Sequence, residues 1–155
     1  MRIADALWAE MVDQLGRRGR GTRESGAFLL AARNGDPRTI SRVVYLDDLD
    51  PNCLTGAISF DGVHYGKLWN ICEQQDLKVI ADVHTHPGRS VAQSGIDKDN
   101  PMIARAGHIA VILPEFATKS ISPREIGVHE YLGDDGWRSA YGASAAKLVY
   151  VGRFA

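Results

Sequence analysis

The sequence has little of several features that mark particular classes of protein. It has two cysteines in 155 residues, Cys53 and Cys72, too few for a disulfide framework or a cysteine-rich zinc module. Eighteen basic and nineteen acidic residues leave a formal charge of -1, so no overall field favours nucleic acid or an anionic membrane. No apolar run approaches the roughly 20 residues of a membrane-spanning helix, and the N-terminus lacks the pattern of a secretory signal. We therefore expect a cytoplasmic protein that binds neither nucleic acid nor membrane.

The composition is that of an ordinary globular chain. Hydrophobic residues make up 45% of the sequence and charged residues 24%, which is typical of folded soluble domains. A chain of this length buries roughly 68–70% of the surface that the unfolded chain exposes. Folding therefore requires neither a disulfide nor a structural metal. We expect residues 1–155 to form a single domain, and any metal site in it to serve chemistry.

The hydrophobic pattern predicts alternating helices and strands. Helices are expected over 4–18, 62–75 and 101–105. Strands are expected over 24–32, 39–46, 57–60, 77–84, 107–113, 125–132, 136–140 and 148–154. The third helix is expected because Asn100-Pro101 is typical of a helix start, and the first two strands are expected to form a hairpin. This order predicts an α/β fold with a mixed central β-sheet flanked by helices.

The clearest chemical pattern lies between His84 and Asp97. Positions i and i+2 of a strand point to the same side, so His84 and His86 can offer two imidazole nitrogens to one point beyond the strand end. Two imidazoles and one carboxylate, with a fourth position open, make a catalytic zinc site. Asp97, brought back by the intervening loop, supplies the carboxylate. Asp82 lies on the same face and is an alternative ligand, although its deeper position favours a supporting role.

Each part of this pattern also has a plainer interpretation. The two histidines would then form a solvated turn, and Ser94-x-x-Asp97 would be only a helix capping box. Neither explains why both imidazoles face one way at the exit of a strand rich in valine and isoleucine, so we favour the metal site. The other histidines, His64, His108 and His129, are expected to be structural or surface residues.

A zinc hydrolase also needs a group that takes up a proton from water and returns it to the leaving amine. Glutamate is scarce, with six in the chain. Two lie on predicted helices and three follow the histidines on later segments. Glu24 alone stands at the mouth of a buried apolar strand, and it is therefore the candidate general base. The alternative for Glu24 is a solvated carboxylate at a strand edge.

Together these residues resemble the JAMM motif of the MPN-plus (JAB-type) metalloprotease family. That motif is Glu, His-Ser/Thr-His, seven residues, Ser, two residues and Asp, matched here by Glu24, His84-Thr85-His86, Ser94 and Asp97. The resemblance implies that His84, His86 and Asp97 bind one zinc ion. It implies that Glu24 activates a water and protonates the leaving amine, and that Ser94 hydrogen-bonds the water or the oxyanion. It also implies the MPN fold, which is similar to that of cytidine deaminases.

The resemblance further implies a class of substrate. Members of this family typically hydrolyse isopeptide or peptide bonds after the C-terminal tail of ubiquitin or a ubiquitin-like protein. In related proteases the tail adds a strand beside a segment that corresponds here to 52–60, and the equal alternative for this segment is a plain internal hairpin strand. The chain is most similar to the compact prokaryotic branch, whose members often accompany ubiquitin-activating-like and conjugating-like enzymes, including in antiviral defence systems. Two alternatives stay open: a peptidase that processes a sulfur-carrier protein, and a non-catalytic MPN scaffold, against which the complete set of five residues argues.

Overall fold

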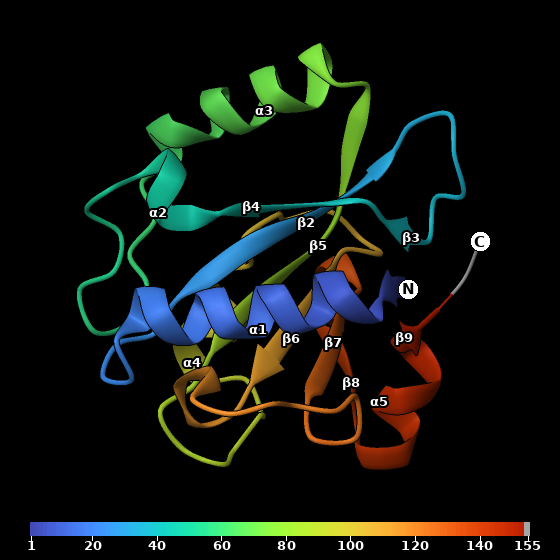
Figure 1. The fold of residues 1–155 in the computed structure, drawn as a ribbon. Helices are drawn as coiled ribbons and strands as arrows, with labels where there is room; N and C mark the ends of the chain where they lie inside the picture. The colour runs from blue at the N-terminus through green and yellow to red at the C-terminus, as the bar shows by residue number, and fades with distance from the viewer. Residues whose placement is uncertain (154–155) are drawn as a thin grey trace.

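The structure, a computed structural model, describes residues 1–153 and is built on a six-stranded mixed sheet (Figure 1). Its strand order is β4-β2-β5-β6-β7-β8. These strands are β2 (Gly26–Ala32), β4 (Arg42–Tyr45), β5 (Leu77–Thr85), β6 (Ile109–Leu113), β7 (Gly127–Tyr131) and β8 (Trp137–Tyr141). Strands β5 and β6 run parallel, and the other neighbouring pairs are antiparallel. The predicted α/β class with a mixed central sheet is confirmed.

A second, smaller sheet joins the two ends of the chain. It has the order β3-β1-β9, from β1 (Arg2–Ala4), β3 (Thr39–Ile40) and β9 (Tyr150–Gly152), and its pairs are parallel. The predicted last strand over 148–154 is therefore confirmed only for Tyr150–Gly152. Leu148 instead ends a helix that the pattern did not predict, and Phe154 lies outside the described residues.

Helices cover both faces of the central sheet. The first is α1 (Asp5–Gly19). The others are α2 (Leu46–Leu49), η1 (Gly62–His64), α3 (Tyr65–Gln74), α4 (Gly95–Asp99), η2 (Glu115–Ala117), η3 (Gly133–Asp135) and α5 (Gly142–Leu148). The predicted helix over 4–18 is confirmed as α1, and that over 62–75 as η1 followed by α3. Within residues 1–153, none of these helices has the length and apolar character needed to cross a bilayer.

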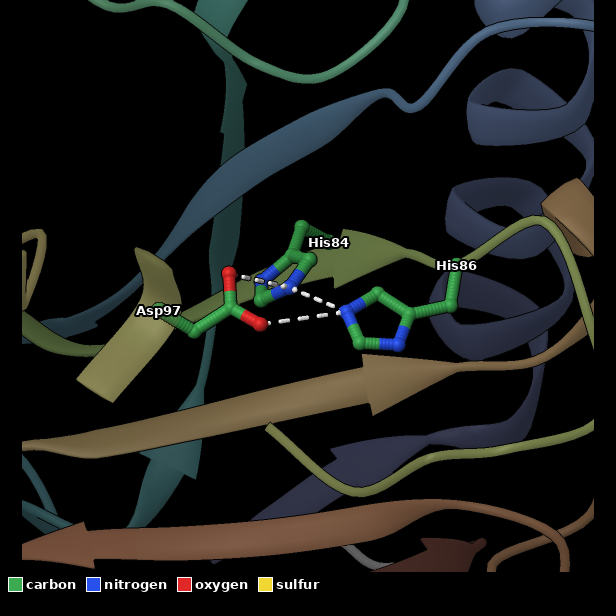
Figure 2. Close-up of side chains that lie close together, drawn as sticks. All are labelled: His84, His86 and Asp97. Carbon is green, nitrogen blue, oxygen red and sulfur yellow. Dashed lines mark hydrogen bonds and ion pairs between the residues drawn. The ribbon is translucent and has the colours of Figure 1, made fainter. Parts of the chain in front are cut away.

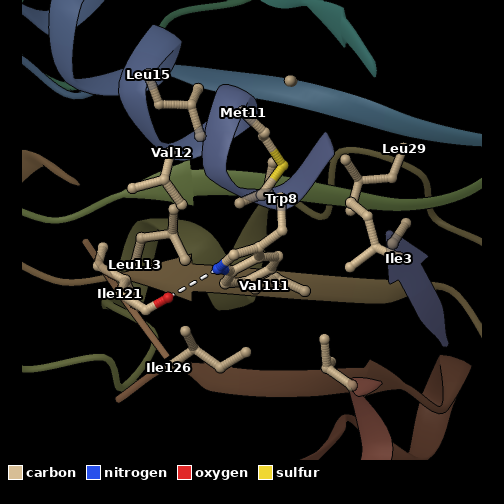
Figure 3. Packing of buried hydrophobic residues seen from close by; sticks show 14 of the residues in the cluster. Ile3, Trp8, Met11, Val12, Leu15, Leu29, Val111, Leu113, Ile121 and Ile126 are labelled. Carbon is tan, nitrogen blue, oxygen red and sulfur yellow. Dashed lines mark hydrogen bonds between the residues drawn. The ribbon is translucent and has the colours of Figure 1, made fainter. Parts of the chain in front are cut away.

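Strand β2 is buried on both sides, as its continuous apolar sequence predicts. Ala27 and Leu29 belong to the core beneath α1, and Phe28 and Leu30 to the core beneath α3. In the first core the indole N–H of Trp8 donates a hydrogen bond of 2.7 Å to the carbonyl of Ile121 (Figure 3). This bond ties α1 to the chain that follows β6 and satisfies a buried donor.

The prediction of a helix over 101–105, in the loop between β5 and β6, is wrong. The structure places α4 just before it instead, at Gly95–Asp99. Asn100 ends α4, since its backbone N–H and its side-chain amide both donate to the carbonyl of Ile96. Pro101 also disfavours helical backbone geometry at Asn100, the residue before it. The Asn100-Pro101 pair therefore marks the end of one helix and not the start of another.

Two strand predictions need correction as well. The segment 57–60 is irregular and is held by an isolated bridge between Leu54 and Ile58. The expected pairing of the first two strands is confirmed from Ala27–Tyr45 to Leu30–Arg42. However, the predicted strand is interrupted at Ser41, and the residues before it, Thr39–Ile40, pair with β1 and not with β2. The strand expected over 24–32 begins at Gly26.

Gly16 allows α1 to approach the turn that follows β6. A β-carbon at Gly16 would lie 2.5 Å from the carbonyl oxygen of Ala117. That turn is η2, whose three residues all have a φ of 52° to 53°, a left-handed conformation that costs about 1 kcal/mol or more per non-glycine residue. Such a constrained backbone has little room to move, and we expect Gly16→Ala to lower the free energy of unfolding by about 1–3 kcal/mol.

Denaturant unfolding measures this difference, and Gly66→Ala is the matched control. Gly66 lies in α3, and a β-carbon there meets nothing within 4 Å. The control should keep or raise the free energy of unfolding, by up to about 1 kcal/mol. Equal stability of the two variants would contradict close packing between α1 and η2.

Candidate metal centre

The start of β2 and the end of β5 meet at one edge of the sheet. The two strands are antiparallel, with Gly26 opposite His84. Two further hydrogen bonds extend the pairing: the N–H of Thr85 donates to the carbonyl of Ser25 at 2.9 Å, and the N–H of Ser25 donates to the Thr85 hydroxyl at 3.0 Å. Glu24, which directly precedes Ser25, therefore lies at the edge where the histidines leave β5.

Three of the predicted site residues form one compact cluster, His84, His86 and Asp97 (Figure 2). The Nε2 atoms of the two histidines lie 3.2 Å apart. His84 Nε2 is 3.5 Å from Asp97 Oδ1, and His86 Nε2 is 3.3 Å from Asp97 Oδ2. In a tetrahedral site with zinc–ligand distances of about 2.0–2.1 Å, neighbouring donor atoms lie about 3.3–3.4 Å apart. The distance between the two Nε2 atoms, and the distance from each Nε2 atom to one of the two Asp97 oxygens, are all close to this spacing, so the three side chains fit one zinc ion.

The orientation of the two rings supports the same fit. Each ring turns Nε2 towards the centre of the cluster and Nδ1 away from it. The Nδ1–H of His86 donates to the carbonyl of Ser90 at 3.2 Å. Nδ1 of His84 faces Asp82 Oδ2 at 4.0 Å. An acceptor beside Nδ1 favours the tautomer that leaves the Nε2 lone pair available for a metal.

The electrostatics of the cluster favour a positive charge at its centre. Burial lowers the pKa of His84, but its contacts with Asp82 and Asp97 outweigh burial and raise that pKa to about 9. Burial raises the pKa of Asp97, yet hydrogen bonds from His84 and His86 hold it well below its usual range. A cation bound between these groups takes the place of the proton on His84, so binding of zinc competes with protonation.

Ser94 and Asp97 also form the capping box that the plainer interpretation predicts. The Ser94 hydroxyl accepts a hydrogen bond from the N–H of Asp97 at 3.2 Å, and the Ser94 N–H donates to Asp97 Oδ2 at 2.7 Å. The two interpretations are therefore compatible, because the cap fixes the Asp97 carboxylate over the histidines. The Ser94 hydroxyl is the acceptor in this pair, so its own proton can be donated elsewhere.

Comparison with solved structures gives the fold a name. No protein-family model matches the chain. The chain is similar to a protein from Desulfitobacterium hafniense solved in solution, with a TM-score of 0.66 at 17% identity, over 99% of this chain and 94% of that one. It is also similar to a JAB1/MPN domain protein from Archaeoglobus fulgidus, with a TM-score of 0.52 at 14% identity, over 97% of this chain and 96% of that one. The chain has the JAB1/MPN fold. Identities this low show the fold alone.

In this JAB1/MPN fold a cleft of about 570 Å³ opens onto the cluster. Glu24, Ser94 and Asp97 all line it, so the structure brings the predicted base and the predicted serine to the predicted ligands. The backbone N–H of Glu24 donates to the carbonyl of Gly56 at 2.7 Å. Within residues 1–153, the Glu24 carboxylate has neither a hydrogen bond nor an ion pair, and it is therefore able to act on a bound molecule.

The cleft of the JAB1/MPN fold is largely apolar away from the cluster. Its other walls include Leu46, Ala57, Ile58, Ser59, Phe60, Tyr65, Ile96, Met102 and Trp137, together with the polar residues Gln93 and Asn100. No sequence pattern predicts the role of Trp137, because its place on the cleft depends on β8 and on the hydrogen bond from its indole N–H to the carbonyl of Lys98 at 3.1 Å.

The remaining histidines lie outside the cluster and make other contacts. His64 is 3.5 Å from Asp50. His129 is fully buried, its Nε2–H donates to the carbonyl of Val91 at 2.9 Å, and burial lowers its pKa. His108 contacts Asp82, the residue considered as an alternative ligand. A lone acidic residue in an apolar strand signals a buried partner, but nothing in the sequence indicates that the partner is His108.

Proposed function

We propose that the chain is a zinc-dependent peptidase that cleaves isopeptide or peptide bonds after the C-terminal tail of a ubiquitin-like protein. The observation that carries this proposal is a compact cluster at one cleft: the Nε2 atoms of His84 and His86 lie close to each other and to the Asp97 carboxylate. Glu24 and Ser94 also line this cleft. A non-catalytic scaffold needs no metal cluster open to a cleft, and no proton acceptor beside it.

The five residues divide the chemistry between them. Zinc, when held by His84, His86 and Asp97, polarises the scissile carbonyl and lowers the pKa of water towards about 7. The unpaired carboxylate of Glu24 accepts a proton and then delivers it to the leaving amine. The Ser94 hydroxyl oxygen accepts from the N–H of Asp97, which leaves its O–H free to donate a hydrogen bond to the water or to the oxyanion that develops on the carbonyl oxygen.

The wall of the cleft between Thr55 and Phe60 suits an extended tail. Exposure alternates along it, with Thr55, Ala57 and Ser59 exposed and the residues between them half-buried. The segment is irregular in the structure, but this alternation of exposure is what an edge strand needs, and we propose that the segment pairs with the tail through its backbone. The small side chains of Ala57 and Ser59 leave room for a narrow peptide.

The proposed activity requires a protein substrate and enzymes that produce it. The substrate is a ubiquitin-like protein, either as a precursor or joined to a target. Activating-like and conjugating-like enzymes of the same cytoplasmic system, such as an antiviral defence system, would make the conjugates that this peptidase removes. Processing of a sulfur-carrier protein differs from this only in the identity of the tail.

A substrate panel tests the proposal directly. Ubiquitin-like and sulfur-carrier proteins are joined through their C-terminal tails to a reporter, by linear or isopeptide bonds, and incubated with the zinc-loaded protein. We expect mass spectrometry to show cleavage directly after one class of tail, its loss with a chelator and its return with added zinc. Zinc-loaded protein that cleaves no member of the panel would contradict peptidase activity and favour a scaffold.

A further inference from the structure

A buried pair of ionisable side chains lies behind the metal cluster and has no part in the mechanism above. Asp82 is 3% exposed and His108 is 7% exposed. Asp82 interrupts an apolar strand, where a carboxylate costs several kcal/mol unless it is fully paired. Asp82 contacts two histidines, His84 in its own strand β5 and His108 just before β6.

The two carboxylate oxygens of Asp82 are divided between these histidines. Oδ1 accepts a hydrogen bond of 2.7 Å from the Nε2–H of His108. Oδ2 faces Nδ1 of His84 at 4.0 Å. Asp82 and His84 are two residues apart in β5, so their side chains leave the same face of the strand. The carboxylate therefore lies on the outer side of the His84 ring, opposite the Nε2 atom that faces Asp97 and His86.

His108 is itself held in place by its backbone. Its N–H donates to the carbonyl of Arg105 at 3.0 Å, and its carbonyl accepts from the N–H of Tyr131 at 2.9 Å. It directly precedes β6, the parallel neighbour of β5, in which Ala110 is paired with Asp82. The imidazole of His108 thus approaches Asp82 from the residue just before β6, whose position is fixed by the central sheet.

The two histidines of the cluster are therefore oriented by different means. His86 lies after the end of β5, and its Nδ1–H is held by a loop carbonyl, that of Ser90. His84 lies inside β5, where the backbone carbonyls are used in the ladder, and it has a buried side chain beside Nδ1 instead. The acceptor beside Nδ1 is thus a loop carbonyl for His86 and the Asp82 carboxylate for His84.

We propose that Asp82 and His108 are positioning residues, which fix the tautomer and the angle of the His84 ring so that Nε2 is aimed at the metal. His108 fixes the Asp82 carboxylate, and the carboxylate fixes His84. Carboxylate–histidine–zinc arrangements of this kind change metal affinity by about 10- to 100-fold when the carboxylate is removed. This inference rests on the metal site of the proposed function, but not on its substrate.

Zinc affinity, measured by competition with a chromophoric chelator, tests the inference without any peptidase assay. We expect Asp82→Asn to weaken zinc binding by about 10- to 100-fold. His108→Leu should weaken it in the same direction, whereas His108→Gln, whose amide can still donate to Asp82, should stay close to the wild type. Because the residues act in series, the double variant Asp82→Asn, His108→Leu should lose no more than Asp82→Asn alone.

Two controls separate positioning from general destabilisation. Leu68→Ala removes a fully buried side chain of the α3 core and so lowers stability away from the cluster. It should keep the wild-type zinc affinity. If Asp82→Asn does not fold, the comparison of His108→Leu with His108→Gln decides. Equal affinities of those two variants, or wild-type affinity in Asp82→Asn, would overturn the inference. Zinc binding without cleavage of any substrate would contradict the proposed function only.

Discussion

Glu24→Gln is expected to bind zinc as tightly as the wild-type protein and to lose about 10²- to 10⁴-fold in its rate of cleavage. The amide has the shape of the carboxylate but cannot accept a proton at neutral pH. Glu24 is not one of the three clustered donors, so the metal stays. Zinc per chain by elemental analysis and single-turnover rates on a cleavable fusion measure the two halves of this result.

The matched control for this substitution is Glu10→Gln. Glu10 lies on the exposed side of α1 and does not line the cleft, so the same chemical change there should alter neither zinc content nor rate. If Glu24→Gln turned over at the wild-type rate, proton transfer by Glu24 would be wrong. If it lost zinc as well, Glu24 would be acting as a ligand.

His84→Ala and Asp97→Ala are each expected to reduce bound zinc from about one ion per chain to nearly none after dialysis. Each removes one of three protein ligands, and the two donors that remain no longer enclose the ion. We expect both variants to stay folded, because the two apolar cores form without any contribution from the cluster. Circular dichroism checks the fold, and elemental analysis checks the metal.

The two variants differ in what else they remove. Asp97→Ala also deletes half of the capping box at the start of α4, whereas His84→Ala leaves the cap intact. Loss of zinc in both therefore reports on the cluster and not on α4. His64→Ala, at a histidine outside the cluster, should keep its zinc. Full zinc occupancy in both His84→Ala and Asp97→Ala would refute the ligand set.

The parts of the fold that the sequence predicts correctly are those governed by burial over several residues. Strand β6 is a continuous run of five apolar residues, β5 is rich in valine, isoleucine and alanine, and α1 presents one apolar face. The sequence pattern does not predict the short helix α5. Ala145 is the one residue of this helix that is buried, so the helix carries no apolar periodicity. Segments of two or three residues, such as β1 and β3, likewise depend on partners distant in the sequence.

In the candidate site, too, the sequence predicts the contacts that local spacing determines and does not predict those that depend on the whole sheet. The spacing of His84 and His86 fixes their common direction through the geometry of a strand, and the Ser94–Asp97 spacing fixes a cap. The contact between Asp82 and His108 spans 26 residues and depends on the register of two parallel strands. Register between parallel strands is set by packing across the whole sheet, so no local pattern of residues predicts this contact.

The double use of Asp97 has a consequence for the dynamics of the chain. One carboxylate both closes the cap of α4 and completes the donor cluster. A helix of five residues has few internal hydrogen bonds and opens readily when left to itself. Order in the segment from Ser90 to Asp99 and occupancy of the cluster are therefore one linked equilibrium, in which the local opening free energy rises with the concentration of the free metal ion. The free metal level sets how long this side of the cleft stays assembled.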